Sequence, residues 1–233
     1  MRQKLDEPIT KLWEQGKLWE LLTDEEREVV NKQVEFVNYK KNEIIHLEGD
    51  VPTHIMIVLT GKVRIYKEGI GQKPQIIRIQ NPGEYFGYRA MIAGDKYNAC
   101  ANAFEPCMIG KLNKETTLWL IKRNIKICYR MMEIMARDLA ISELQTVNLT
   151  QKHIRGRLAE ALLNLKQNHG VESDGKTLNI QISREDIANL SSMTTSNAIR
   201  TLSQFAQEKL IDVDGRRIQL LDEEELKRIS RLG

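Results

Sequence analysis

The chain has 233 residues, of which 41% are hydrophobic and 29% charged, and its net charge is +3. This length suits one large or two modest globular domains, and no apolar stretch approaches the roughly 20 residues of a membrane span. Because the net charge is small, the chain is not a polyelectrolyte, and we expect it to bind nucleic acid only through a local patch. The charged N-terminus argues against a signal peptide, so we expect a cytoplasmic protein that contacts no membrane.

The first predicted element is helical and covers residues 9–38. Within it, Thr23 is followed by three acidic residues, 24–26, which indicates a helix start. The threonine hydroxyl caps free backbone N–H groups, and the carboxylates stabilise the positive end of the helix dipole. Val29, Val30 and Val34 are expected to form the apolar side of this helix.

From Glu35 to Leu112 the pattern changes to short β-rich runs bounded by Gly, Pro, Asn or Asp. The runs are EFVNY, EIIHLEG, HIMIVLTGKVRIYKE, QIIRIQNPGEYFG and NACANAFEPCMIGKL. Short strands that alternate with turn signals are typical of an all-β sandwich or barrel. We therefore predict a β domain in this part of the chain.

A long helix is predicted over residues 115–149, with apolar residues at heptad spacing. The expected seam consists of Leu118, Ile121, Ile125, Cys128, Met132, Met135, Leu139 and Ser142. Alternating steps of three and four residues favour packing of two helices in a dimer. A second stripe is expected to pack against the β domain and consists of Ile127, Met131, Ile134 and Ile141. The alternative is a helix buried wholly within one chain.

After a linker at 149–152, a helix is predicted from about His153, then a polar loop and a short strand, LNIQIS. The stretch 182–211 reads ISREDIANLSSMTTSNAIRTLSQFAQEKLI. Ser183 and Thr194 suit the starts of two short helices joined by a three-residue turn, which is a helix-turn-helix. The second helix has its buried stripe at Ala198, Leu202 and Phe205.

The opposite face of that second helix carries short or forked hydrogen-bonding side chains instead of the usual surface Lys and Glu. The following KLIDVDGRRIQLLD predicts a hairpin with an Asp-Gly turn, a wing whose arginines are well placed for phosphates. Dimers of such domains present two of these helices to half-sites about one turn of DNA apart. The predicted DNA-binding residues are Thr194, Thr195, Ser196, Asn197, Arg200, Ser203, Arg216 and Arg217.

From about Leu18 to Asp222 the layout resembles the cyclic AMP receptor protein superfamily, the Crp–Fnr regulators. The resemblance rests on GDVPTHIMIVLTGKVRIYKEG, NPGEYFG, MARDLA, RGRLAEALLNL and the helix-turn-helix. It implies an α+β chain with an N-terminal cyclic-nucleotide-binding-like β-roll, a long dimerisation helix and a C-terminal winged helix-turn-helix. The corresponding domains are 1–114, 115–149 and 150–233. It further implies a homodimer that binds a two-fold symmetric operator in double-stranded DNA.

The resemblance also locates an effector pocket, where the chain departs from the cyclic-nucleotide-binding branch. Gly87-Tyr88 occupies the position of that branch's Gly-Glu, and 97–99 occupies the position of its Arg-Ser-Ala, so a charge-assisted contact to phosphate is lost. On the long helix, Ser142 matches one of two purine-contacting hydroxyls. The expected pocket residues are Gly87, Tyr88, Arg89, Tyr97, Asn98, Ala99 and Ser142.

We therefore predict a regulator that responds to an unknown small-molecule effector other than cyclic AMP, or to none. The alternatives are a cyclic-nucleotide-responsive regulator and a sensor that acts through protein contacts. Arg200 matches the family's base-reading arginine, whereas Thr195 and Ser196 replace the Arg and Glu of the catabolite activator, so a different operator is expected. Loop 168–177 lies where family activators touch RNA polymerase.

No cofactor or metal is predicted. Three cysteines, Cys100, Cys107 and Cys128, are too few for a four-thiolate cluster within one chain and lack zinc spacing. A redox switch between the first two stays open. His46 and His54 are available for haem ligation but are interpreted as ordinary strand or loop histidines. No nucleophile–base pair or phosphate-binding loop predicts an enzyme.

Overall fold

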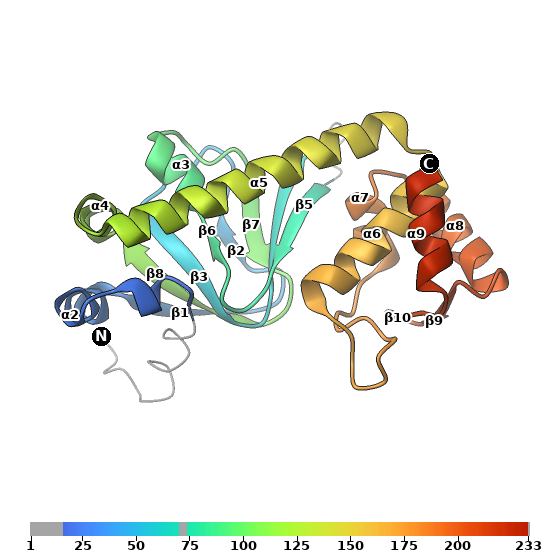
Figure 1. Ribbon diagram of the computed structural model, residues 1–233, viewed down its shortest axis with the longest axis horizontal. Helices are drawn as coiled ribbons and strands as arrows, with labels where there is room; N and C mark the ends of the chain where they lie inside the picture. The colour runs from blue at the N-terminus through green and yellow to red at the C-terminus, as the bar shows by residue number, and fades with distance from the viewer. Residues whose placement is uncertain (1–15, 70–73, 233) are drawn as a thin grey trace. The chain divides into compact units, whose positions relative to one another are not determined.

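The computed structural model describes residues 16–69 and 74–232, and the chain divides into two units. Of the described residues, 16–69 and 77–139 belong to the first unit, and 74–76 and 140–232 belong to the second. Figure 1 labels the helices and strands of both. Among the described residues, no helix is long and apolar enough to cross a membrane. The three-domain division at 114 and 149 stays a prediction.

The N-terminal helix is shorter than predicted. A 3₁₀ turn, Trp19–Leu21, precedes α2, Asp24–Gln33, and residues 9–15 lie outside the described part of the chain. The predicted start is confirmed, because the Thr23 hydroxyl accepts from the Glu26 N–H and the Glu26 carboxylate accepts from the Thr23 N–H. The helical prediction for 34–38 is wrong. Residues 35–39 instead form a strand, β1, as the overlapping prediction for EFVNY states, and pair antiparallel with β8, Cys107–Asn113.

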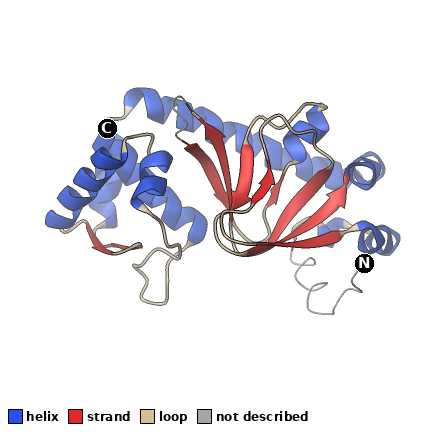
Figure 2. Ribbon diagram, turned by 180° about the vertical axis from the view of Figure 1, so that it is seen from behind, coloured by secondary structure: helices blue, strands red, loops and turns tan. Residues whose placement is uncertain are grey.

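The β-rich region forms two four-stranded sheets, shown in red in Figure 2. One sheet has the order β1-β8-β3-β6, and its strands are Glu35–Tyr39, Cys107–Asn113, His54–Thr60 and Tyr85–Phe86. The other has the order β2-β7-β4-β5, and its strands are Ile44–His46, Cys100–Ala103, Val63–Glu68 and Pro74–Gln80. Residues from both sheets share one apolar core cluster, including Val58, Val63, Ala101 and Ile109. We call this arrangement the β-roll.

The long helix is interrupted, so the prediction of one continuous seam from Leu118 to Ser142 is wrong. Helix α4 is Lys114–Arg123 and α5 is Ile125–Gln151, with an extended residue, Asn124, between them. The Asn124 side chain accepts from the N–H groups of residues 126 and 127, as an N-cap does. Its amide donates to the Leu21 carbonyl and to the Glu26 carboxylate at 2.8 Å. These contacts stabilise the break.

The second unit contains the predicted helix-turn-helix and wing. Its elements are α6 Ile154–His169, α7 Arg184–Leu190, α8 Thr195–Gln207, β9 Ile211–Asp214, β10 Arg217–Leu220 and α9 Glu223–Leu232. The Asp-Gly turn is confirmed, since Gly215 has φ +56° between β9 and β10. The predicted strand LNIQIS is wrong. Only isolated bridges form at Thr177 and Leu178, because the segment docks beside the wing by single backbone bonds.

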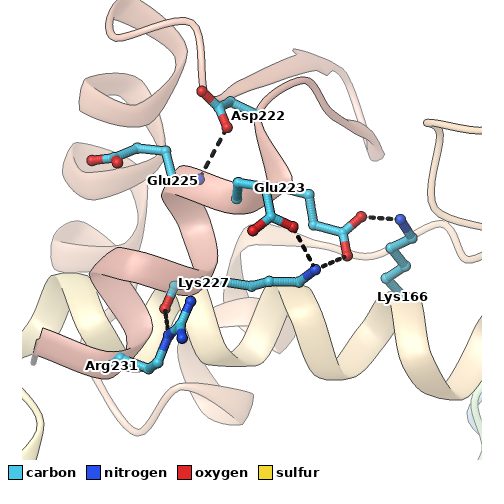
Figure 3. Close-up of polar contacts among 7 residues, drawn as sticks. Lys166, Asp222, Glu223, Glu225, Lys227 and Arg231 are labelled. Carbon is cyan, nitrogen blue, oxygen red and sulfur yellow. Dashed lines mark hydrogen bonds and ion pairs between the residues drawn. The ribbon is translucent and has the colours of Figure 1, made fainter.

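Helix α9 completes this unit and was not predicted. It packs on α6, where Lys166 pairs with Glu223 and Lys227 contacts the same carboxylate at 3.1 Å (Figure 3). Asp222 starts the helix by accepting from the Glu225 N–H at 3.0 Å. Its Leu226 is fully buried. Helix α9 therefore contributes to the core of the second unit through its contact with α6.

Candidate nucleic-acid interface and internal pocket

Helix α8 is held by its cap and by one apolar side. The Thr194 hydroxyl accepts from the Asn197 N–H at 3.3 Å, so Thr194 is the N-cap, as predicted. Ala198, Leu202 and Phe205 are at most 3% exposed and form the predicted buried stripe. This packing leaves the side chains opposite the stripe facing away from the core.

Most of the predicted contact residues of α8 lie together on its exposed face. Thr195, Ser196, Arg200 and Ser203 are exposed, whereas Asn197 is half-buried. An Arg200 guanidinium N–H donates to the Asn197 side-chain oxygen at 3.0 Å, and this bond orients the guanidinium. The other guanidinium N–H groups are directed to solvent and can donate to acceptors such as guanine N7 and O6.

The two wing arginines differ. Arg216 is exposed at the hairpin turn, next to Gly215. Arg217 instead forms an ion pair with Glu172, which belongs to the loop after α6. The predicted role of Arg217 in binding phosphate therefore requires that this exposed pair opens, which costs little because exposed pairs are weak.

The loop that carries Glu172 is ordered by Asp174. This carboxylate accepts from the Thr177 hydroxyl and from the N–H groups of Lys176 and Thr177. These hydrogen bonds, with the Thr177 hydroxyl first, lower the pKa of Asp174 to about 2. The loop expected to meet RNA polymerase thus has a defined turn.

The C-terminal end of α8 is fastened to α6. Arg155 forms a two-pronged contact with Glu208, at 2.8 and 2.7 Å, and its guanidinium lies 4.9 Å from the centre of the Phe205 ring. A guanidinium at a helix C-terminus also offsets the negative end of the dipole. Helix α8 is thus held at both ends, so its exposed side chains keep a fixed position relative to the rest of the unit.

A pocket lies inside the first unit, between the β-roll and the first half of α5. A short helix that was not predicted, α3, Tyr88–Ala93, forms one side of it. Gly87 starts α3 with φ +80°, and an added Cβ there would come within 2.7 Å of Met56. Only glycine fits this position without displacing its neighbours.

Six of the seven predicted pocket residues line this one pocket. They are Gly87, Tyr88, Arg89, Tyr97, Asn98 and Ala99. The seventh, Ser142, is exposed on α5 within the second unit, and its role stays a prediction.

Two charged pocket residues were missed: Arg78 on β5 and Asp138 on α5. A signal for Asp138 existed, because it lies four residues after Ile134 on the second stripe predicted for α5. The prediction that Ile141 belongs to this stripe is wrong, since Ile141 is 49% exposed.

Asp138 is the centre of a buried polar network. Its carboxylate accepts from Arg78 at 2.6 Å and from the Tyr88 hydroxyl, and it is only 8% exposed. Burial, followed by the hydrogen bond to Asp138, raises the pKa of Tyr88 above its ordinary value of 10. The network joins β5, α3 and α5 through side chains far apart in sequence.

The rest of the pocket is largely filled by aromatic side chains. The His46 ring stacks on Tyr97 with centroids 3.8 Å apart. Burial lowers the pKa of His46 to about 4, so it is neutral at pH 7, and burial raises the pKa of Tyr97 to about 12. The free volume left is about 40 Å³, well below the roughly 300–1,000 Å³ typical of ligand pockets.

The exposed face of α5 differs in register from the predicted seam. Ile127 and Met131 are buried in the apolar cluster beneath α5, and Met135 packs partly against it. The exposed apolar residues of α5 up to residue 139 instead recur at steps of four and three. They are Ile125, Tyr129, Met132, Ala136 and Leu139. This face is apolar, and it includes three of the predicted seam residues but not Cys128 or Met135.

Two family models match the chain. The cyclic nucleotide-binding domain matches residues 36–124, which include the β-roll and α4, and the Crp-like helix-turn-helix domain matches residues 156–229. One match lies in each unit, and residues 125–155, which include α5, lie between the two matches.

Named relatives agree with these matches. The cyclic AMP receptor protein of Thermus thermophilus is 27% identical over 190 residues, or 79% of this chain and 85% of that protein. The CRP-like cAMP-activated global transcriptional regulator of Mycobacterium tuberculosis is 22% identical over 203 residues, 87% of this chain and 91% of that protein. In fold, the chain is similar to FixK2 from Bradyrhizobium japonicum, with a TM-score of 0.76, 22% identity, and coverage of 84% and 96% of the two chains.

Proposed function

The chain is a DNA-binding transcription regulator of the Crp–Fnr family, and from this premise we propose that it is a cytoplasmic homodimer that binds a two-fold symmetric operator without needing cyclic AMP. Its reading element is α8, assisted by the wing, and its dimer contact is the exposed face of α5. RNA polymerase is the expected partner of loop 168–177.

The observation that carries the independence from cyclic AMP is the network around Asp138. A carboxylate already holds Arg78, one of the two arginines that line the pocket. A bound phosphate would lie near this negative charge, and like charges repel strongly where water is excluded. Tyr88, where the cyclic-nucleotide branch has its ribose-binding Glu, donates its hydroxyl to the same carboxylate. Two polar groups of the pocket, the Arg78 guanidinium and the Tyr88 hydroxyl, are thus already bonded within the chain.

Dimerisation is supported by the apolar character of the α5 face. Ile125 is 76% exposed, Tyr129 61% and Leu139 60%, so a second copy of α5 would bury a substantial apolar area. The steps of four and three residues suit packing of two parallel copies about a two-fold axis. Two copies would also supply the paired α8 helices that a symmetric operator needs.

The cyclic-nucleotide-responsive alternative has one observation in its favour. The names of the relatives from Thermus thermophilus and Mycobacterium tuberculosis both refer to cyclic AMP. In this chain a second arginine, Arg89, also lines the pocket. Binding of the nucleotide would then require Arg78 to leave Asp138.

The test is selection of duplexes from a random pool with the purified protein, followed by titration at fixed salt with and without cyclic AMP. We expect tight binding to a two-fold symmetric duplex that cyclic AMP leaves unchanged. Arg200→Ala should weaken that binding by about 1–3 kcal/mol and relax one base position per half-site. Arg231→Ala, which removes the same charge from α9, is the control and should bind like the native protein.

Binding that appears only with cyclic AMP would contradict the proposed independence and favour the alternative. No sequence-selective binding under either condition would instead favour a sensor that acts through protein contacts. Equal weakening of Arg200→Ala on every duplex would identify Arg200 as a phosphate contact.

Glu172→Gln is expected to raise affinity for every duplex about two- to fivefold. The change frees Arg217 from its ion pair, so that the guanidinium can contact a phosphate. Each additional phosphate contact releases counterions, so the slope of log affinity against log salt should steepen by about 0.9 per wing. Titrations at several salt concentrations measure both quantities.

The matched control is Glu224→Gln, which removes the same negative charge from α9. If it strengthens binding as much as Glu172→Gln does, the effect belongs to net charge and the specific restraint of Arg217 is contradicted.

A further inference from the structure

One residue on the exposed face of α8 does not fit its polar surroundings. Ile199 is 46% exposed, although the apolar residues of α8 that form the core, such as Ala198 and Phe205, are fully buried. A β-branched residue is also a weaker helix former than Ala, Leu or Lys. Neither core packing nor helix stability accounts for isoleucine at this position.

Ile199 lies in the middle of the predicted reading surface. It follows Thr195 by one helical turn, precedes Ser203 by one turn and is next to Arg200 in sequence, and all three are exposed. The Ser203 hydroxyl donates to the backbone carbonyl of Ile199 at 3.0 Å, and the isoleucine is itself 46% exposed. A ligand that reaches the hydroxyls and the guanidinium therefore also meets this apolar side chain.

The chemistry of the major groove supplies one partner for such a side chain. Base edges there present hydrogen-bond donors and acceptors, and the only apolar group among them is the thymine 5-methyl. Phosphates offer Ile199 no comparable contact, because a phosphate requires a cation or a donor. A polar face with one central apolar residue matches a row of base edges that contains one thymine methyl.

We propose that Ile199 is a specificity-determining residue that contacts the 5-methyl group of a thymine in each half-site. This inference rests on the proposed function, since it requires that α8 enters the major groove. The inference adds a base position in each half-site that the protein selects by an apolar contact, besides the base position that Arg200 selects by hydrogen bonds.

The test replaces each thymine of one selected half-site, one at a time, with deoxyuridine, which removes only the methyl group. For the native protein we expect one thymine per half-site whose replacement weakens binding about fourfold, the effect of exposing one buried methyl. Ile199→Ala should bind the unmodified duplex about fourfold more weakly and lose sensitivity at that position. Ile199→Val, which keeps a branched apolar side chain, should retain the sensitivity. Because Ile199 is exposed, these variants should fold, and circular dichroism checks this.

Three results would overturn the proposal: a half-site without thymine, no thymine sensitive to deoxyuridine, or a sensitivity that persists in Ile199→Ala. Each of these occurs with a protein that binds its selected duplex, so each is distinguishable from failure of the proposed function. If the native protein selects no duplex at all, both the function and the inference fail together.

Discussion

Replacing Met132 and Leu139 together by glutamate is expected to convert the dimer to monomers and to weaken operator binding by at least about a hundredfold. Both residues lie on the exposed apolar face of α5, 49% and 60% exposed in one chain. In a two-fold dimer each carboxylate would be buried near its own copy, and buried unpaired charge is costly. A monomer also loses the second α8 and with it the gain from bivalent binding.

Sedimentation velocity measures the oligomeric state, and fluorescence anisotropy with the selected duplex measures affinity. The matched control is Ile44→Glu with Val51→Glu, which introduces the same charges at exposed apolar positions of the β-roll. That control should remain dimeric and bind normally. Unchanged dimerisation of the α5 variant would show that another surface holds the two copies together.

Asp138→Asn is expected to destabilise the first unit by about 2–3 kcal/mol. The change leaves the Arg78 guanidinium without its counter-charge in a site where the two side chains are 22% and 11% exposed. Breaking a fully buried ion pair costs about 3–5 kcal/mol, and the residual exposure here reduces that figure. Tyr88→Phe removes only one hydrogen bond to the same carboxylate, so a smaller loss of about 1 kcal/mol is expected.

Urea unfolding of the full chain, followed by tryptophan fluorescence, measures these losses, because Trp19 and Trp119 belong to the first unit's core. Glu133→Gln is the control. It removes a partner of Arg130 on the same helix, but that pair is more exposed and should contribute less than 1 kcal/mol. If Asp138→Asn is as stable as the control, the network does not hold β5, α3 and α5 together.

The helix-turn-helix and the wing could be predicted from the sequence because their signals are local. A capping residue such as Thr194 acts within one turn, an apolar stripe repeats within one helix, and the turn at Gly215 depends on one residue's φ. The same reasoning placed the start of α2 at Thr23. Helix α9 carried an equally local start at Asp222 and was overlooked.

Tertiary contacts decided what local patterns left open. The break at Asn124 depends on the Leu21 carbonyl and the Glu26 carboxylate, about a hundred residues away, so heptad spacing alone suggested an unbroken helix. The register of the exposed α5 face followed from which residues the β-roll buries. Whether segment 178–182 forms a strand depended on the wing beside it.

The pocket illustrates the same division. The family resemblance placed six residues around it, 87–89 and 97–99, because each triplet lies at a short motif of the family. Arg78 and Asp138 are 60 residues apart, and no local pattern joins them. The sequence by itself therefore determined the helix-turn-helix and the run of strands. The fold alone decided which charges meet, because burial and counter-charge are properties of the surroundings that packing creates.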